Sequence, residues 1–459
     1  MEEGRKVPCI GIDLGTAYTR ASLFDGTHCR IIPDDQGNSN MPSYVAFTGS
    51  GVLIGKTAKK QAMQNTTNTI FGSRYSHSSV RDDMRLWPFK VIASQNNRLL
   101  VEVSWKGKLW QFTPVEICSI ILTQIIKNAE KHLRATITNA VITVPVQFNY
   151  EQRQAIKEAG MISGLNFMQI INAPSASALF YSKEMLSKSS GTQSISRSEF
   201  EEYNMFIFDF GAGALDISLI TLQEEFCLVR ATAGNVHLGG SDFDNNMVYH
   251  VVNLLKSKGH KDVSNNLSSV RELRTTCEHA KALWSSGSKT VQMMIGPNEF
   301  SISAETFNEL NKELFLKCID SIDTCLRDAK MSADMVDEVI LVGASTRIPT
   351  LQAHINQYFK GKAPKVSNRL ETAPVYGAAL QAYFLISTRG YGRGNRLFLL
   401  NAMSFSLGIQ SPEGVMVVFI PKGTTIPTRT ERICHYSNNS KPVVEIYEGE
   451  GDARTIEKD

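Results

Sequence analysis

The chain has 459 residues, of which 42% are apolar and 20% charged, and its net charge is +3. These values are typical of a globular protein with two to four domains. So small a net charge argues against a chain built to bind nucleic acid or a membrane surface.

The eight cysteines are scattered without a C-x-x-C pair, and no histidine lies in a zinc-binding motif. Scattered cysteines suit a reducing compartment. The first residues, Met1-Glu2-Glu3-Gly4-Arg5-Lys6, carry no apolar signal segment, and no apolar run approaches the roughly 18 residues of a membrane-spanning helix. We therefore expect a soluble, cytoplasmic protein, located in the cytosol with the nucleus as an alternative.

The stretch from Ile10 to Phe24 predicts a strand, a tight turn and a second strand. Gly15 lets the backbone of the turn approach an anion closely, so that several N–H groups can point at one phosphate. Asp13, at the end of the first strand, is placed to hold a cation such as magnesium through water. Taken alone, the pattern also fits an ordinary hairpin with an aspartate in its turn.

Further elements complete the first half of the chain. Periodicity predicts strands at 31–32, 43–47, 99–105, 141–144 and 170–172, and helices at 56–72, 113–134, 150–160 and from 173 onward. Thr113, Pro114 and Glu116 supply the N-cap, the first position and an acidic first turn for the longest of these helices. The Ser-rich segment 187–202 predicts a surface loop and a hinge between two halves.

The second half repeats the first. Three features recur in the same order, each 196 to 200 residues later (209 − 13, 339 − 141, 374 − 174): Asp13 as Asp209, strand 141–144 as 339–342, and Ala173-Pro174 as Ala373-Pro374. Three ordered matches indicate an internal duplication. Two similar α/β halves, each with a phosphate-binding hairpin, predict a nucleotide held between them.

Other features of the second half fit a nucleotide site. The Gly-rich turn 237–244 enters a helix whose N-terminus is a second candidate anion site. Helices are predicted at 270–285 and 303–329, and strand 339–342 leads into the small-residue turn 343–349. Arg347 in this turn has a planar group able to stack on a purine, and a solvated surface arginine is the alternative.

From Thr388 the composition changes. Residues 389–396 are rich in Gly and Arg and predict a flexible linker, which the apolar run Leu397–Leu400 follows. Short strands separated by Pro- and Gly-containing turns are then expected at 404–409, 415–420, 431–436 and 443–447. Together they predict a small β unit.

The sequence resembles the seventy-kilodalton heat-shock chaperone family over essentially its whole length. The matching runs are Gly11–Thr16, Pro42–Phe47, Ile207–Asp209 with Gly211 and Gly213, His237–Gly240 with Asp242–Asp244, Ser345–Pro349 and Tyr376–Ala379. The resemblance implies an α/β fold with a duplicated actin-like (ribonuclease-H-like), two-lobed ATPase domain at 1–386, lobe I at about 1–185 and lobe II at about 186–386. It also implies an interdomain linker at 387–400 and a partial substrate-binding β-sandwich at 401–459.

The resemblance further implies a function. It is that of an ATP-binding chaperone of the stress response, which binds unfolded or extended polypeptide under nucleotide control, with J-domain co-chaperones and nucleotide-exchange factors as partners. ATP or ADP and Mg²⁺ would be the cofactors, with Asp13 and Asp209 holding the hydrated metal and acting with Arg74 in catalysis. The nucleotide-binding positions carried over are Gly15, Thr16, Ala17, Tyr18, Ala212, Gly213, Ala214, Gly239, Gly240, Glu278, Lys281, Ser285, Ala344, Ser345 and Arg347.

Several positions depart from the family pattern. Arg74 stands where the family has a lysine that positions the attacking water, and Ala173 where it has a glutamate. In the second phosphate loop Ala212 requires a negative φ and Ala214 lacks a hydroxyl, and Ala282 replaces a second stacking arginine. Loss of one positioned acid or base group costs about 10²–10⁴-fold in rate, whereas backbone N–H groups still bind phosphate. We expect nucleotide binding with weakened or absent hydrolysis.

The β unit departs as well. Met416 and Tyr436 match a pair that would arch over a bound peptide, and Val444 and Ile446 would line its pocket. Only about four strands follow the linker, without the remaining strands or a helical lid. Strand edges and apolar surface should therefore be exposed, and a captured peptide should exchange quickly.

Three functions stay open on the sequence. The first is an ATP-controlled chaperone whose nucleotide state alters the linker and the β unit. The second is a hydrolysis-deficient regulatory or interaction protein, favoured by Ala173, Ala214 and the missing lid. The third, a sugar kinase or filament-forming actin relative, shares the paired hairpins but does not explain the β unit.

Overall fold

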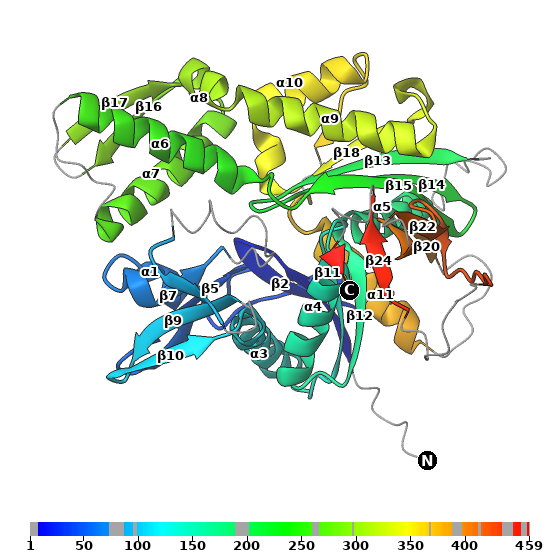
Figure 1. The fold of residues 1–459 in the computed structure, drawn as a ribbon, viewed down its shortest axis with the longest axis horizontal. Coiled ribbons are helices and arrows are strands. Elements are labelled where there is room, and N and C mark those ends of the chain that lie inside the picture. Colours follow the sequence, from blue (N-terminus) through cyan, green and yellow to red (C-terminus); the bar gives the residue numbers. More distant parts are fainter. Residues whose placement is uncertain are drawn as a thin grey trace.

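The structure, a computed structural model, describes residues 8–72, 87–94, 99–188, 202–258, 266–295, 298–366, 369–387, 397–411, 415–433, 444–450 and 457–458. Two large sheets with their helices form most of the molecule, and a small sheet near the C-terminus lies beside them (Figure 1). The first sheet belongs to the half that the sequence predicts as lobe I, and the second to lobe II.

The sheet of lobe I has the strand order β12-β11-β1-β2-β3, and β4 also pairs with β2. Its central strand β1 runs parallel to β11 and antiparallel to β2. The bounds are β1 Cys9–Leu14, β2 Tyr18–Phe24, β3 Cys29–Ile32, β4 Met41–Pro42, β11 Asn139–Val144 and β12 Phe167–Asn172.

The sheet of lobe II repeats this order as β19-β18-β13-β14-β15 and continues into β20 and β23. Its central strand β13 is again parallel to one neighbour, β18, and antiparallel to the other, β14. The bounds are β13 Tyr203–Phe210, β14 Leu215–Gln223, β15 Phe226–Asn235, β18 Glu338–Val342, β19 Lys365–Val366, β20 Phe398–Ala402 and β23 Thr425–Ile426.

Helices cover both sheets, and smaller sheets extend each lobe (Figure 1). The helices are α1 Lys56–Lys60, α3 Pro114–Leu133, α4 Tyr150–Ile162, α5 Ala173–Lys188, α6 Gly240–Ser257, α7 Leu267–Ser285, α8 Ala304–Leu310, α9 Lys312–Ala329, α10 Pro349–Tyr358 and α11 Ala373–Ile386, with 3₁₀ turns η1 Thr66–Asn68, η3 Ala333–Met335 and η4 Ala344–Arg347. The remaining strands of the lobes are β5 Tyr44–Thr48, β6 Gly51–Ile54, β7 Thr69–Phe71, β8 Lys90–Ala93, β9 Leu99–Trp105, β10 Lys108–Phe112, β16 Thr290–Ile295 and β17 Asn298–Ser303.

Local sequence explains the longest helix, α3. The Thr113 hydroxyl accepts a hydrogen bond from the Glu116 N–H, and the Glu116 carboxylate accepts one from the Thr113 N–H, which completes a capping box. The apolar stripe that includes Ile117, Leu122 and Ile126 is buried, as predicted. The helix ends where Arg134 takes a left-handed conformation.

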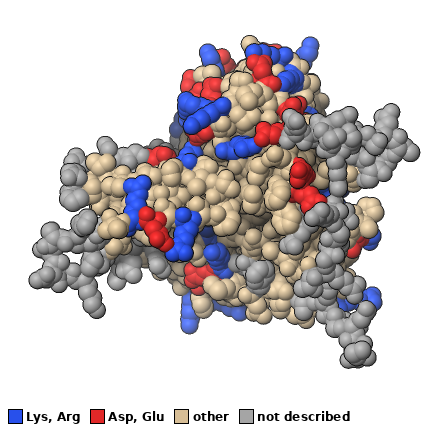
Figure 2. All heavy atoms as spheres, turned by 90° about the vertical axis from the view of Figure 1, so that its right-hand side faces the viewer, with Lys and Arg blue, Asp and Glu red and all other residues tan. Residues whose placement is uncertain are grey.

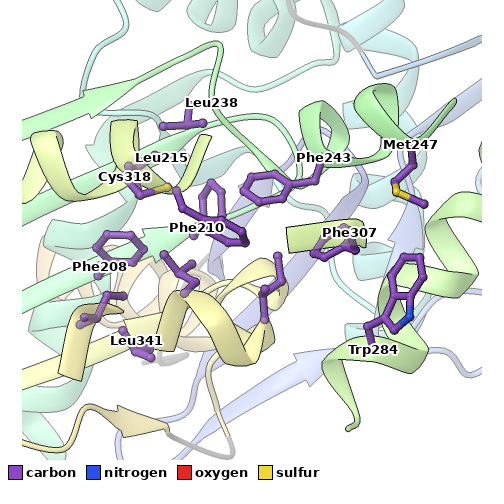
Figure 3. Close-up of a cluster of buried hydrophobic side chains, with 14 of the residues drawn as sticks. Phe208, Phe210, Leu215, Leu238, Phe243, Met247, Trp284, Phe307, Cys318 and Leu341 are labelled. Atoms are coloured by element: carbon purple, nitrogen blue, oxygen red, sulfur yellow. The ribbon is translucent and has the colours of Figure 1, made fainter. Parts of the chain in front are cut away.

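Each lobe has its own apolar core. In lobe II, Phe208 and Phe210 of β13 pack with Phe243 of α6, and the cluster continues to Trp284 and Phe307 (Figure 3). Helices α5 and α11 pack against each other between the two large sheets. The crossing is so close that a Cβ on Gly377 would lie 1.7 Å from the carbonyl oxygen of Ala176. This contact fixes how the two halves meet.

Two predicted elements of the lobes differ in the structure. Residues 56–72 form only the short α1 and η1 and then strand β7, because Ile70 and Phe71 are buried in a pairing with β5. The helix predicted at 303–329 is two helices. Asn311, fully buried, separates them: its side-chain amide donates to the Phe307 carbonyl and its side-chain oxygen accepts from Asn246.

Part of the predicted linker is also a strand. Residues 388–396 lie outside the described part of the chain, but β20 adds to the lobe II sheet parallel to β15, with Phe398 opposite Phe226. The two rings stack with their centroids 5.4 Å apart. The apolar run therefore gains backbone hydrogen bonds at a sheet edge that would otherwise be open.

The small β unit has four paired strands, in the order β22-β21-β24-β25. Their bounds are β21 Ser406–Gln410, β22 Met416–Ile420, β24 Ile446–Gly449 and β25 Glu457–Lys458. The strand predicted at 431–436 is not formed at Glu431–Ile433, and its remaining residues lie outside the described part. Apolar side chains are exposed on this unit, as expected: Val415, Val417, Val418, Ile433, Val444 and Ile446.

The distribution of charged side chains on the surface agrees with the low net charge. On the face that Figure 2 shows, acidic and basic side chains are mixed, without a large area of one sign among the coloured residues. No helix in the described ranges is both long and apolar enough to span a bilayer.

Candidate functional site

A cavity of about 730 Å³ lies between the two lobes, within the size range of small-molecule sites. Both predicted phosphate loops line it, at residues 13–18 and 211–214. Helix α7 and the turn at 343–347 complete the wall on the lobe II side. Of the predicted nucleotide positions, all except Gly239 and Gly240 line the cavity.

The two loops have the same hydrogen bond at the same place. The Gly15 N–H donates to the Tyr18 carbonyl at 3.2 Å, and the Gly211 N–H donates to the Ala214 carbonyl at 3.1 Å. The loops also touch, since a Cβ added to Gly213 would lie 2.2 Å from the Thr16 hydroxyl oxygen. Two similar backbone turns thus face one space, the geometry in which N–H groups can surround a phosphate chain.

Ala212 has the negative φ that the sequence requires of it. It is not among the described non-glycine residues with positive φ, which are Lys106, Arg134, Glu224, Lys330 and Lys360. Ala212 therefore fits the second loop without backbone strain.

The N-terminus of α6 has a different role from the one predicted. The N–H groups of Gly240 and Ser241 donate to the carbonyls of Gly211 and Ala212, at 3.0 and 2.9 Å. Gly239 packs so tightly on this loop that a Cβ would lie 2.4 Å from the Ala212 carbonyl oxygen. These groups hold the second loop in place, so this helix end is not a separate anion site.

Three carboxylates line the cavity at the turns of the two hairpins, with Asp209 and Asp216 buried and Asp13 mostly so. Burial raises the pKa of Asp13, against the opposing effects of Arg20 and of a 2.7 Å hydrogen bond from the Thr143 hydroxyl. Burial, followed by repulsion from Asp216 and Asp13, raises the pKa of Asp209 well above its usual value. Burial also raises the pKa of Asp216 to about 7, although the Val146 N–H donates to it at 2.8 Å.

This donor set fits a hydrated magnesium ion. Magnesium prefers oxygen ligands and keeps much of its water, and Asp13 and Asp209 supply carboxylate oxygens in a place where negative charge is in excess. The described residues contain no group of three or more Asp, Glu, His or Cys side chains close enough to hold a metal by themselves. A metal here would therefore share its coordination with water and with phosphate.

The buried Asp216 predicts a pH dependence of stability without nucleotide. A folded-state pKa raised from 3.8 to about 7 means that the folded protein binds this proton more tightly than the unfolded chain. The stability that protonated Asp216 contributes is full below about pH 4 and is lost as pH rises through 7.

Asp216→Asn keeps an oxygen for the Val146 N–H but never ionises. We expect D216N to be more stable than the wild type at pH 8, by up to about 4 kcal/mol, and by much less at pH 5. Thermal unfolding at both pH values measures this, and an equal difference at the two would contradict it.

Polar groups on the lobe II wall hold helices α6 and α7 together. The Lys281 ammonium donates to the Asp244 carboxylate at 2.5 Å and to the Gly240 carbonyl at 2.6 Å. The Ser285 hydroxyl donates to the Lys281 carbonyl within α7. The Ser345 hydroxyl donates to the Gly211 carbonyl at 2.9 Å, linking the 343–347 turn to the second phosphate loop. Glu278 completes this wall.

Arg347 lines the cavity at its more exposed side. Its guanidinium donates to Glu371 at 3.0 Å, and Glu371 also accepts from Arg20 at 3.1 Å. Sequence reasoning missed Arg20, Glu371 and Asp216. The predicted hairpin register could have placed Arg20 beside Asp13 and Asp216 beside Asp209, but nothing in the sequence places Glu371, which is 351 residues from Arg20.

The remaining predicted residues are placed as follows. Ala173 and Ala282 line the cavity. Arg74 and Tyr436 lie outside the described residues. Met416 is buried against Tyr447, so in this conformation it has no surface to offer a peptide, whereas Val444 and Ile446 are more than half exposed.

Comparison with known proteins identifies the family of the chain. The Hsp70 protein family model matches residues 9–459. Heat shock 70 kDa protein 2 of Paracoccidioides lutzii is 41% identical over 456 residues, covering 96% of this chain and 68% of the relative. Heat shock cognate 70 kDa protein 3 of Dictyostelium discoideum is 40% identical (98% of this chain, 71% of the relative), and a ribosome-associated molecular chaperone of Zygosaccharomyces rouxii is 38% identical (98% and 73%). The chain belongs to the Hsp70 family.

Proposed function

We propose that this chain is a chaperone of Hsp70 type that binds ATP and ADP with Mg²⁺ between the lobes of a duplicated, actin-like domain. The observation that carries the proposal is the cavity lined by both phosphate loops, which meet at Thr16 and Gly213. The equal strand order of the two large sheets supports the duplication. Family membership favours this proposal over the third alternative, a sugar kinase or filament-forming actin relative.

The residues have distinct roles in this proposal. Backbone N–H groups of Thr16–Tyr18 and Ala212–Ala214 bind the phosphates, and Gly15 lets the first loop approach them closely. Glu278, Lys281, Ser285, Ala344, Ser345 and Arg347 surround the ribose and the adenine. The Arg347 guanidinium can stack on the purine. Asp13 and Asp209 orient the water around the magnesium ion. When bound, that ion neutralises charge on the phosphates.

Hydrolysis is weak in this proposal. Phosphoryl transfer depends on positioned charges and hydrogen-bonding groups. Ala173 lines the cavity but has no carboxylate, and Ala214 has no hydroxyl. The alternative, a nucleotide-binding regulatory protein without useful hydrolysis, is favoured by the same two residues.

The β unit is the proposed site for extended polypeptide. Its exposed apolar side chains, including Val444 and Ile446, supply surface for such a segment. Nucleotide control has a path through β20, which joins the lobe II sheet and leads into the unit. J-domain co-chaperones and exchange factors follow as partners from the family, nascent chains follow as clients from the ribosome-associated relative, and the cytosol is the expected location.

A peptide-release experiment tests this function. A fluorescent, extended, apolar peptide is bound to the protein, and its dissociation is followed after adding ADP or ATP with magnesium. The proposal expects binding in both states and a dissociation rate at least about tenfold faster with ATP, which corresponds to about 1.4 kcal/mol. Equal rates with the two nucleotides would favour the regulatory alternative, and absent peptide binding would contradict the chaperone role.

A further inference from the structure

Arg20 lines the cavity beside Asp13, one of the two carboxylates assigned to the metal. It is directly opposite Asp13 in the β1–β2 hairpin, and its Nη1 lies 3.7 Å from the Asp13 Oδ2. Its Nη2 donates to Glu371 in lobe II at 3.1 Å, so the guanidinium lies between two carboxylates. Only 10% of its side chain is exposed.

The duplicated position in lobe II has the opposite charge. Asp216 is opposite Asp209 in the β13–β14 hairpin, in the same register that places Arg20 opposite Asp13. The two hairpins therefore contribute three carboxylates, two of them buried, and one arginine to the region where the phosphate loops meet. Arg20 relieves part of this excess negative charge.

Other basic side chains of the cavity wall have partners elsewhere. The cavity-lining Lys and Arg residues that the structure describes are Arg20, Lys59, Arg274, Lys281 and Arg347. Lys281 binds Asp244, Arg274 donates to Asn245, and Lys59 lies over the rings of Tyr18 and Tyr44. Arg347 lies on the other side of Glu371. Among these five basic residues, Arg20 is thus the one that forms an ion pair with Asp13, a carboxylate assigned to the magnesium ion.

The geometry points to Arg20 as a nucleotide-binding residue that supplies, beside Asp13, part of the positive charge otherwise provided by a divalent cation. A nucleoside diphosphate then keeps much of its affinity when magnesium is removed. The inference rests on the proposed nucleotide site and goes beyond it by naming a cation that belongs to the chain. An arginine stays charged at all physiological pH values, so its positive charge beside Asp13 does not depend on pH.

A merely structural role for Arg20 would give a different result. In that case its importance would lie in the ion pair with Glu371, which joins the lobes, and not in its charge at Asp13. Arg20→Gln removes the charge, Arg20→Lys keeps a charge, and Glu371→Gln breaks the ion pair while leaving the arginine.

Calorimetric titration with ADP, in buffer with Mg²⁺ and in buffer with EDTA, separates these roles. The quantity compared is the ratio of the Kd in EDTA to the Kd in Mg²⁺. We expect R20Q to raise this ratio at least about tenfold over the wild type, R20K to restore most of the wild-type ratio, and E371Q to stay near it. Circular dichroism checks that each variant is folded, and R20K still tests the charge if R20Q does not fold.

Two results would overturn the inference. One is an equal ratio in R20Q and the wild type, and the other is an increase in E371Q as large as that in R20Q, which would assign Arg20 a structural role. A wild-type protein that binds no ADP even with Mg²⁺ is distinguishable from both, and it would overturn the proposed nucleotide function itself.

Discussion

Gly377→Ala is expected to destabilise the protein by about 3 kcal/mol, at the upper end of the usual cost of overpacking a core. A Cβ at this position would lie 1.7 Å from the Ala176 carbonyl oxygen, 2.3 Å from its carbonyl carbon and 2.8 Å from its Cα. These are backbone atoms of α5, so no side chain can turn away. Helices α5 and α11 would have to separate at the place where the two lobes meet.

Denaturant unfolding of G377A measures this cost. Gly49→Ala is the matched control, because a Cβ there meets nothing within 4 Å. We expect G49A to unfold close to the wild-type midpoint. If G377A and G49A unfold at the same denaturant concentration, the close crossing of α5 and α11 is not what holds the lobes together.

Ala173→Glu is expected to raise the rate of ATP hydrolysis by about 10²-fold, the lower end of the range for one positioned acid or base group. Ala173 lines the cavity as the first residue of α5. A carboxylate there is compatible with the helix, since negative charge is favourable in a first turn. The lower end is expected because Arg74 and Ala214 still depart from the family pattern.

Single-turnover hydrolysis with enzyme in excess over ATP is the measurement, and Ala173→Gln is the control of equal size without the charge. ADP affinity should change little in both variants, because phosphate binding depends mainly on the backbone of the loops. If A173E and A173Q hydrolyse ATP at the same rate, the missing carboxylate does not explain the defect. A wild-type rate near that of a full-length family member would contradict the defect itself.

The sequence predicts the part of the site that depends on short segments. The strand–turn–strand patterns around Asp13 and Asp209 are local, and their repetition places both loops at equivalent points of two sheets. The structure has both hairpins in the predicted form, with the turn hydrogen bonds of Gly15 and Gly211 in equivalent places. The capping residues of α3 are equally local, and that helix begins at the predicted residue.

The parts that sequence reasoning missed depend on distant contacts. The helix predicted at 303–329 is interrupted because Asn311 bonds to Asn246 of another helix, which periodicity cannot reveal. Residues 69–71 are a strand because they pair with β5, and 398–402 because they pair with β15 and β23. The pairing of Arg20 with Glu371 joins opposite ends of the chain. In each case a tertiary partner overrides the local pattern.

The most direct test of the central claim is calorimetry of the wild-type protein with ADP, ATP and adenosine in magnesium buffer. If the paired loops bind the phosphates, ADP and ATP should each bind at one site per chain, and adenosine should bind at least about a hundredfold more weakly, a difference of about 2.7 kcal/mol. Folded protein that gives no heat with ADP or ATP, or that binds adenosine as tightly as ADP, would contradict the account.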